Sequence, residues 1–120
     1  MAVRGVNPSD QSAGKTHRFT WEGLLNGDSG QPVTIPGAAD MSVQVIIVAA
    51  GTGDTIILEG SLEETPSNWF QLRDGGNNLI SFTGDDGEAI SPMVMHVRPR
   101  VTAGDGTTEF TAILLARRTK

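Results

Sequence analysis

The feature that most constrains this chain is a series of short segments in which apolar and polar residues alternate. Val43, Val45 and Ile47, for example, alternate with Ser42 and Gln44. Side chains of a β-strand point to opposite faces in turn, so a period of two predicts strands with one buried face. Clusters of Gly, Asp and Asn separate these segments, and such residues favour turns. The sequence therefore predicts an all-β protein.

A second alternating stretch lies near the C-terminal end. One face holds Met93, Met95, Val97 and Val101, and the other holds Val94, His96, Arg98 and Arg100. We expect His96 on the exposed polar side of this strand. Pro99 removes a backbone donor, which predicts an edge position or a bulge. The turn at 103–106 then leads into Phe110–Ala116, which is typical of a β-hairpin.

The spacing of these segments predicts seven or eight strands with turns about every 8–12 residues, as in an antiparallel β-sandwich or a small barrel. We find no convincing helix. The expected strands lie near residues 17–24, 32–35, 41–49, 55–61, 69–72, 79–82, 89–101 and 110–116.

Two parts of the chain are expected. Residues 1–16 are rich in Gly, Pro, Ser and Asn and lack an apolar period, which indicates a flexible N-terminal arm outside the core. Residues 17–120 form one β-sandwich domain, and a domain of this length buries roughly two-thirds of its unfolded surface. An arm of this kind is either a frayed end or a segment that lies along a neighbouring molecule.

Charge is unevenly distributed. The net charge of −5 comes from +2 in residues 1–20, −10 in residues 21–92 and +3 in residues 93–120. An acidic body argues against nucleic acid as a partner, because binding to a phosphate backbone needs a basic surface. The basic ends leave two interpretations open: acidic loops that favour solubility, or ends that dock on an acidic partner such as a neighbouring copy.

The composition excludes several kinds of site and makes a membrane location unexpected. The chain has no cysteine, so it forms no disulfide and no thiolate metal site. No apolar run approaches the roughly 20 residues of a membrane helix, and no membrane partner is expected. Residues 1–15 lack the apolar region of a signal peptide, so we expect synthesis in a cytoplasm.

No catalytic motif is visible. The two histidines, His17 and His96, have no second ligand at a metal-binding spacing, and we find no nucleophile elbow or phosphate-binding loop. The carboxylates gather in Asp-Gly turns, where Asp caps its own backbone. We therefore expect no enzyme activity, no metal and no cofactor.

The two tryptophans invite different interpretations. Trp21 lies in an alternating segment and is expected in the core. Trp69 opens a strand directly after a polar loop, so it is a core or loop anchor or, if exposed, a platform for a carbohydrate.

Two segments are apolar on both faces. Ile46–Val48 and Ala112–Leu115 lack the polar alternation of a sandwich strand with one face in water. Their second face needs a cover. That cover is either a loop or the arm of the same chain, or another subunit.

Several segments together resemble small structural proteins of tailed bacteriophages. They are residues 31–36 (QPVTIP), 39–45 (ADMSVQV), 58–61 (LEGS), 67–72 (SNWFQL) and 97–106 (VRPRVTAGDG). In that family a similar strand end precedes an Asp/Gly-rich loop and an Asn-Trp pair. Residues 62–66 (LEETP) depart from the pattern.

The resemblance is to capsid decoration, or cement, proteins. It implies a jelly-roll β-sandwich that packs as dimers or trimers on the outside of a phage head, against the major capsid protein. Such a protein stabilises the shell by binding only its assembled form. The alternatives are a carbohydrate-binding module and another neck or tail protein of the virion. The residues that we expect at contacts with capsid or subunits are Arg4, Lys15, Arg18, Glu63, Glu64 and Trp69.

Overall fold

The computed structural model describes residues 2–11, 16–34, 38–90 and 94–118, and these residues form strands, turns and loops without a helix. The all-β prediction is thus confirmed. The strands are β1 (Val3–Arg4), β2 (Val6–Gln11), β3 (Thr16–Leu25), β4 (Ser29–Gly30), β5 (Val33–Thr34), β6 (Ala38–Ala49), β7 (Thr55–Ser61), β8 (Phe70–Gln71), β9 (Ser81–Phe82), β10 (Asp86–Ile90), β11 (His96–Ala103) and β12 (Glu109–Arg118).

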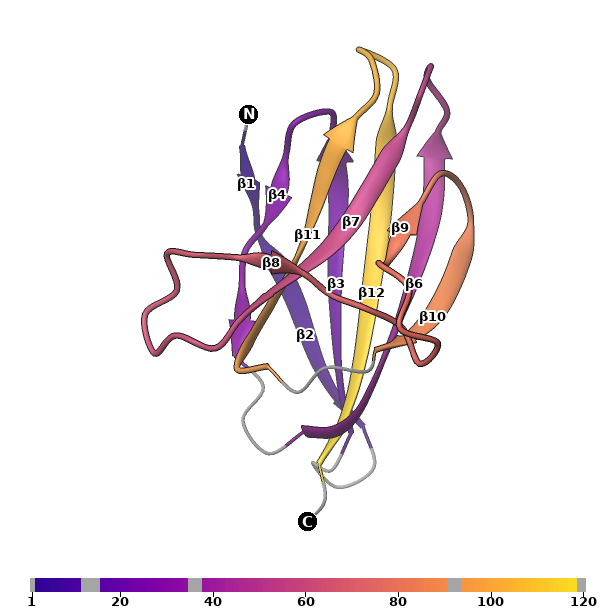
Figure 1. The fold of residues 1–120 in the computed structure, drawn as a ribbon. Coiled ribbons are helices and arrows are strands. Elements are labelled where there is room, and N and C mark those ends of the chain that lie inside the picture. Colours follow the sequence, from indigo (N-terminus) through magenta and orange to yellow (C-terminus); the bar gives the residue numbers. More distant parts are fainter. Residues whose placement is uncertain (1, 12–15, 35–37, 91–93, 119–120) are drawn as a thin grey trace.

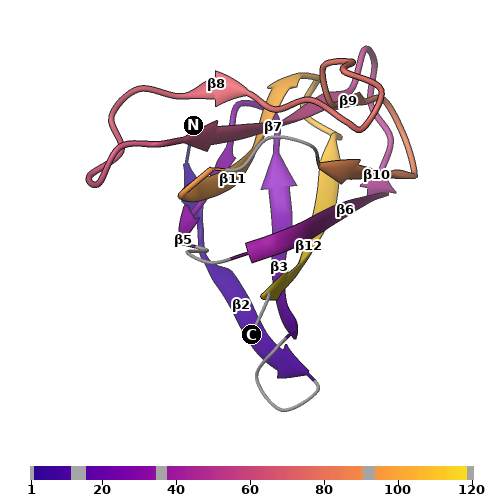
Figure 2. The ribbon, with the colours of Figure 1, turned by 60° about the horizontal axis from the view of Figure 1, so that its bottom comes forward.

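The strands form two sheets that face each other (Figures 1 and 2). Sheet A has the order β1-β4-β11-β7-β8, with β5 also paired to β11 and β9 also paired to β7. Sheet B has the order β10-β6-β12-β3-β2. In the middle of each sheet, strands that are far apart in the sequence lie side by side, β4-β11-β7 in sheet A and β6-β12-β3 in sheet B, as in the wrapping of a jelly roll. The predicted sandwich is therefore correct.

The strand count is higher than the seven or eight expected. The N-terminal segment adds β1 and β2, and both β8 and β9 pair with β7. The strand expected near 89–101 is divided into β10 and β11, which belong to different sheets. The strand expected near 32–35 is the two-residue β5, and β4, which precedes it, was not expected; both pair with β11. Pro99 explains the gap between β4 and β5. The N–H of Val101 donates to Asp28 on the β4 side, and by alternation the missing donor of Pro99 faces the same side, where β4 and β5 are separated.

The core lies between the sheets and follows the alternation. Sheet B contributes Trp21, Val43, Val45 and Leu114 among others, and sheet A contributes Ile56, Leu58, Val97 and Val101. Trp21 is fully buried, as predicted. The alternation does not extend before β11, because Val94 is buried and Met95 is exposed. Met93 lies outside the described residues.

Residues 2–11, the described part of the expected N-terminal arm, do not lie outside the sandwich. Val3–Arg4 pairs in parallel with β4 of sheet A, and Val6–Gln11 pairs with β3 of sheet B. The chain therefore passes from one sheet to the other at Gly5 and closes one side of the sandwich. Sequence reasoning missed these strands because an edge strand is held by backbone hydrogen bonds, which need no apolar period.

The acidic turns are structural, as expected. Asp105 accepts hydrogen bonds from the N–H groups of Thr107 (2.9 Å) and Thr52 (2.9 Å), which joins the turns β11–β12 and β6–β7. These bonds, the one from Thr107 first, lower the pKa of Asp105.

Candidate binding surfaces

The outer side of sheet A carries a polar ladder. In the antiparallel pair β7–β11, Glu59 lies opposite Arg98, and Ser61 lies opposite His96. These side chains point away from the core, because the alternate residues of both strands are buried in it. We call the outward residues Glu59, Ser61, His96, Arg98 and Arg100, together with Trp69, the sheet-A face.

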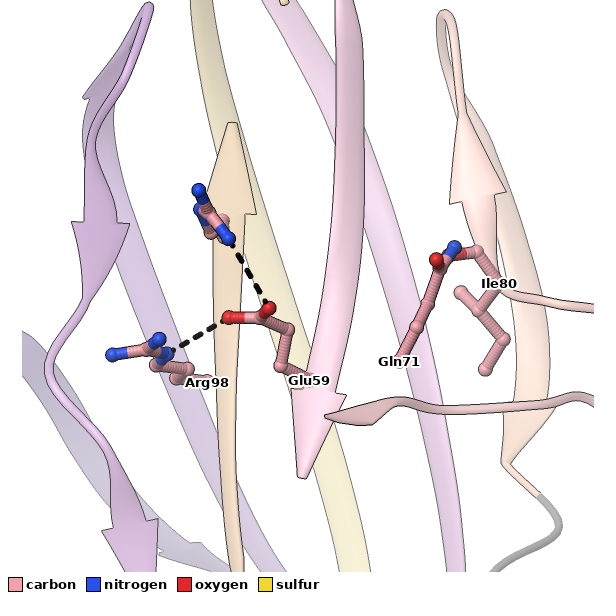
Figure 3. Close-up of polar contacts among 5 residues, drawn as sticks. Glu59, Gln71, Ile80 and Arg98 are labelled. Atoms are coloured by element: carbon pink, nitrogen blue, oxygen red, sulfur yellow. Dashed lines mark hydrogen bonds and ion pairs between the residues drawn. The ribbon is translucent and has the colours of Figure 1, made fainter. Parts of the chain in front are cut away.

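Glu59 holds two arginines on this face. Arg98 Nε lies 3.0 Å from one carboxylate oxygen, and an Arg100 terminal nitrogen lies 3.5 Å from the other. Figure 3 shows both ion pairs, with Gln71 turned toward the carbonyl oxygen of Ile80, to which it donates at 3.0 Å. The Glu59 side chain is only 8% exposed, whereas that of Arg100 is 46% exposed. Two guanidinium groups against one carboxylate leave a net positive charge, and Arg100 presents it to solvent.

Trp69 belongs to the same cluster. The guanidinium carbon of Arg98 lies 4.1 Å from the centre of the Trp69 ring, a cation–π contact. Trp69 is half-buried, so it is a loop anchor with part of its ring accessible. One face of the ring is taken by Arg98, and a sugar stacked on Trp69 would have to use the other face.

His96 is buried, and the expectation that it is exposed was wrong. Alternation placed it on the correct face of β11, but the loop between β7 and β8 crosses that face (Figure 1). Its Nε2 lies 3.3 Å from the carbonyl oxygen of Glu64, and its Nδ1 lies 3.1 Å from the Thr34 hydroxyl. Because a carbonyl oxygen only accepts, Nε2 carries a proton. His96 thus fastens the loop to sheet A.

Glu63 and Glu64 differ in their availability to a partner. Glu63 accepts hydrogen bonds from the backbone N–H groups of Ser67 (3.0 Å) and Asn68 (2.7 Å), which lower its pKa, the bond from Ser67 most strongly. This carboxylate is therefore a cap within the loop. Glu64 is exposed, as are the apolar side chains of Leu62 and Phe70.

Arg4 forms part of a structural clamp at the side of the sandwich. Its Nε lies 2.6 Å from Asp28. Asp28 also accepts from the N–H groups of Ala2 (3.0 Å) and Leu25 (2.9 Å), so it ties β1 to the β3–β4 turn. Burial raises the pKa of Asp28, but the hydrogen bonds from Arg4, Leu25 and Ala2 together outweigh it, and the pKa lies below its ordinary value.

We expect Asp28→Asn to lower the free energy of unfolding at neutral pH by about 1–2 kcal/mol. The Arg4 side chain is 38% exposed, so solvent screens the ion pair and the loss comes mainly from the backbone hydrogen bonds. Because the folded pKa is depressed, the carboxylate stabilises the fold above its unfolded pKa of about 3.9, and this stabilisation is lost as pH falls through the folded value. Urea unfolding at several pH values measures the difference, which should shrink in acid.

Glu64→Gln is the control for this prediction, because the exposed Glu64 side chain makes no hydrogen bond or ion pair with another described residue. It should change the free energy of unfolding by less than about 0.5 kcal/mol. A difference between Asp28→Asn and the natural chain that grows as the pH is lowered would contradict the role of Asp28.

The outer side of sheet B is apolar along its middle. The outward residues of β12 are Thr111, Ile113, Leu115 and Arg117, because the residues between them are buried. Ile113 lies between Gln44 and Thr20, and Leu115 lies between Ser42 and Arg18. We call the outward residues of β3, β6 and β12 the sheet-B face. They are Thr16, Arg18, Thr20, Glu22, Leu25, Asp40, Ser42, Gln44, Ile46, Val48, Glu109, Thr111, Ile113, Leu115 and Arg117.

The described chain leaves this face open. Ile46, Val48 and Leu115 are 36%, 56% and 42% exposed. A shallow hollow of about 500 Å³ lies over Ser42, Gln44, Ile113 and Leu115, and one of about 340 Å³ lies beside it at Asp40 and Arg117. The N-terminal segment, one of the covers considered above, extends sheet B at its edge beside β3 and does not cross it. The second apolar face of β6 and β12 is therefore available to another molecule.

The residues expected at contacts do not form one patch. Trp69, Glu63 and Glu64 lie at the sheet-A face or in the loop over it, Arg4 lies in the clamp with Asp28, and Arg18 lies on the sheet-B face. Lys15 lies outside the described residues. Sequence reasoning missed Glu59. The Arg-Pro-Arg spacing indicates that two arginines share a face, but only the register of β7 against β11 shows which acid they meet.

Two searches of the described residues were negative. No group of three or more His, Cys, Asp or Glu is placed to hold a metal ion. No helix long and apolar enough to cross a membrane is found.

Fold and surfaces together define a jelly-roll β-sandwich with two different outer faces. The solved structure of the SPBc2 prophage-derived protein YomS has a similar fold, with a TM-score of 0.59 and 9% identity, covering 84% of this chain and 93% of that chain. The cupin domain of Schizosaccharomyces pombe Cnp3 gives a TM-score of 0.46 and 8% identity, covering 95% of this chain and 61% of that one. At such identities the likeness to YomS concerns the fold alone. No family model and no curated protein matches the sequence.

Proposed function

We propose that this protein is a structural component of a tailed-bacteriophage virion that decorates or cements the outer surface of the head. The observation that carries the proposal is that both outer sides of the sandwich are open to other proteins, with an accessible arginine on sheet A and an exposed apolar surface on sheet B. The segments that resemble phage decoration proteins support it, and so does a fold shared with a prophage-derived protein.

Two opposed faces suit this role. The sheet-A face carries a net positive charge, because Arg98 and Arg100 share the single carboxylate of Glu59, and Arg100 remains accessible. It would dock on an acidic surface of the major capsid protein, and the sheet-B face would meet another copy of the chain. A protein that binds the assembled shell and not its free subunits shifts the assembly equilibrium by mass action. The role is structural rather than catalytic.

Heads purified from a phage that encodes this chain test the proposal. Quantitative mass spectrometry should find the chain in a fixed, high copy number relative to the major capsid protein. Absence from the head would overturn the proposal.

The docking surface is tested with heads that lack the chain and are then mixed with purified variants. Arg100→Glu should weaken binding about tenfold or more, since it puts a negative charge where a positive one meets an acidic surface. Arg73→Glu makes the same charge change at another exposed arginine, in the loop between β8 and β9, and should bind as the natural chain does. Equal binding by all three proteins would exclude the sheet-A face as the docking surface.

A further inference from the structure

The edge strands of sheet B carry residues that oppose pairing with a strand of another molecule. Pro8 lies in β2 at one edge and lacks a backbone donor. The other edge strand, β10, carries Asp86 and Glu88. Prolines and charges at edges oppose the addition of a further strand. A partner of sheet B is therefore expected to cover its face rather than to extend it.

Charge is polarised along this face. Glu109 lies at the start of β12, and Glu22 projects from β3 near the same end. Arg18 and Arg117 lie toward the opposite end, where Arg117 pairs with Asp40. Ile113 and Thr20, which are paired, lie midway between the acidic and the basic end. The acidic end thus carries a charge of −2 from Glu22 and Glu109, and the basic end carries a net charge of +1, because Asp40 offsets one of the two arginines. The apolar side chains Ile46, Ile113 and Leu115 form a strip between polar neighbours.

This pattern is complementary to a reversed copy of itself. When two copies stack face to face with their strands antiparallel, the acidic end of each meets the basic end of the other, and the two apolar strips coincide. Stacking with parallel strands would bring acid against acid and base against base, which costs energy. A two-fold axis that crosses the strands generates the antiparallel arrangement and closes the assembly at two copies.

The whole outer side of sheet B, in which β2 and β10 flank the sheet-B face, is large enough for a dimer. Five strands about 4.8 Å apart and about eight residues of 3.4 Å along each strand give a plane of roughly 650 Å². A stable interface buries about 800 Å² of accessible surface per partner, and accessible surface exceeds the plane beneath it.

We propose that two copies of this chain pair through their sheet-B faces, with antiparallel strands and the Ile113–Thr20 pair at the two-fold axis. The occupant of the open face is a second copy of the same chain. Leu115 and Ile46 supply apolar contacts on either side of the centre, and Arg18 of each copy lies toward Glu22 of the other.

Sedimentation of the purified chain tests the pairing and should show a dimer. Leu115→Glu should raise the dissociation constant about 100-fold or more, because it would bury a carboxylate of each copy beside the centre and draw Arg18, which lies opposite Leu115, away from Glu22 of the other copy. Leu79→Glu is the matched control. Leu79 is similarly exposed but lies just before β9 of sheet A, so this variant should remain a dimer. A monomeric natural chain would overturn the inference, and so would equal dissociation of the two variants with both folded by circular dichroism.

Cross-linking tests the orientation, and the absence of natural cysteines allows single ones to be introduced. Thr16 lies at the basic end of β3, and Leu25 lies at its acidic end. A mixture of Thr16→Cys and Leu25→Cys chains should be joined by a short bis-maleimide, whereas Thr16→Cys alone should not. Efficient joining of Thr16→Cys alone would show parallel strands and overturn the arrangement. These results do not depend on phage heads, so a monomer that still binds heads would refute the pairing and leave the proposed function intact.

Discussion

Replacement of Trp21 by alanine is expected to lower the free energy of unfolding by about 3–5 kcal/mol, the range for removal of a large aromatic side chain from a core. Trp21 is fully buried, and its indole N–H donates to the carbonyl oxygen of Gln31 at 2.9 Å. Alanine would leave a cavity between the sheets and remove that bond. Since domains of this size are stable by only about 5–15 kcal/mol, a large part of the total would be lost. Urea unfolding followed by far-ultraviolet circular dichroism measures the change.

Trp69→Ala is the matched control, because the chain has two tryptophans and Trp69 lies on the outer face. The loss there is mainly the contact with Arg98, worth about 0.5–1 kcal/mol at an exposed site. The Trp69→Ala protein should emit blue-shifted fluorescence from the buried Trp21. A larger destabilisation by Trp69→Ala than by Trp21→Ala would contradict the placement of both rings.

The second large loss of stability is expected from Gly30→Ala, which adds a single methyl group. A Cβ atom at Gly30 would lie 2.6 Å from a side-chain carbon of Pro99 and 2.6 Å from a ring carbon of Trp21. Both neighbours are rigid rings in the packed interior, so neither can move aside without displacing its strand. Overpacking of this kind costs about 1–3 kcal/mol, and we expect the upper half of that range. The midpoint of urea unfolding should fall accordingly.

Gly5→Ala serves as the control for Gly30→Ala. Nothing lies within 4 Å of a Cβ atom at Gly5. Alanine there should be neutral or should stabilise by up to about 1 kcal/mol, because it restricts the unfolded chain. If Gly30→Ala were as stable as Gly5→Ala, β4 could not pack against Pro99 and Trp21 as described.

Much of the fold could be predicted from alternation. It located β3, β6, β7 and β12 and the burial of Trp21, because a period of two reports directly on which side of a strand is apolar. It could not predict β1 and β2, which are held by backbone pairing and by the Arg4–Asp28 clamp. Short edge strands of this kind have no compositional signature.

The binding surfaces could be predicted only in part. The two-sided apolar segments predicted a second face on β6 and β12 that needs a cover, either from the same chain or from another subunit. The described part of the N-terminal segment pairs at the edge of sheet B and does not supply that cover. The charged cluster at Glu59 depends on the register between β7 and β11, which a single sequence does not fix. The burial of His96 depends on the path of the loop at residues 62–69. Alternation predicts to which face of the sheet a side chain points, but it does not predict whether a loop covers that face.

The passage of the N-terminal segment from sheet A to sheet B has a practical consequence for anyone handling the protein. Residues 6–11 shield the edge of β3, a ten-residue strand. A protease that removed the first eleven residues would expose the unpaired amide and carbonyl groups of that strand. It would also remove Pro8, which opposes the addition of a further strand. Long bare edges act as templates for fibre growth. Samples nicked in this segment should therefore be the first to gel or precipitate on storage, while intact material stays clear.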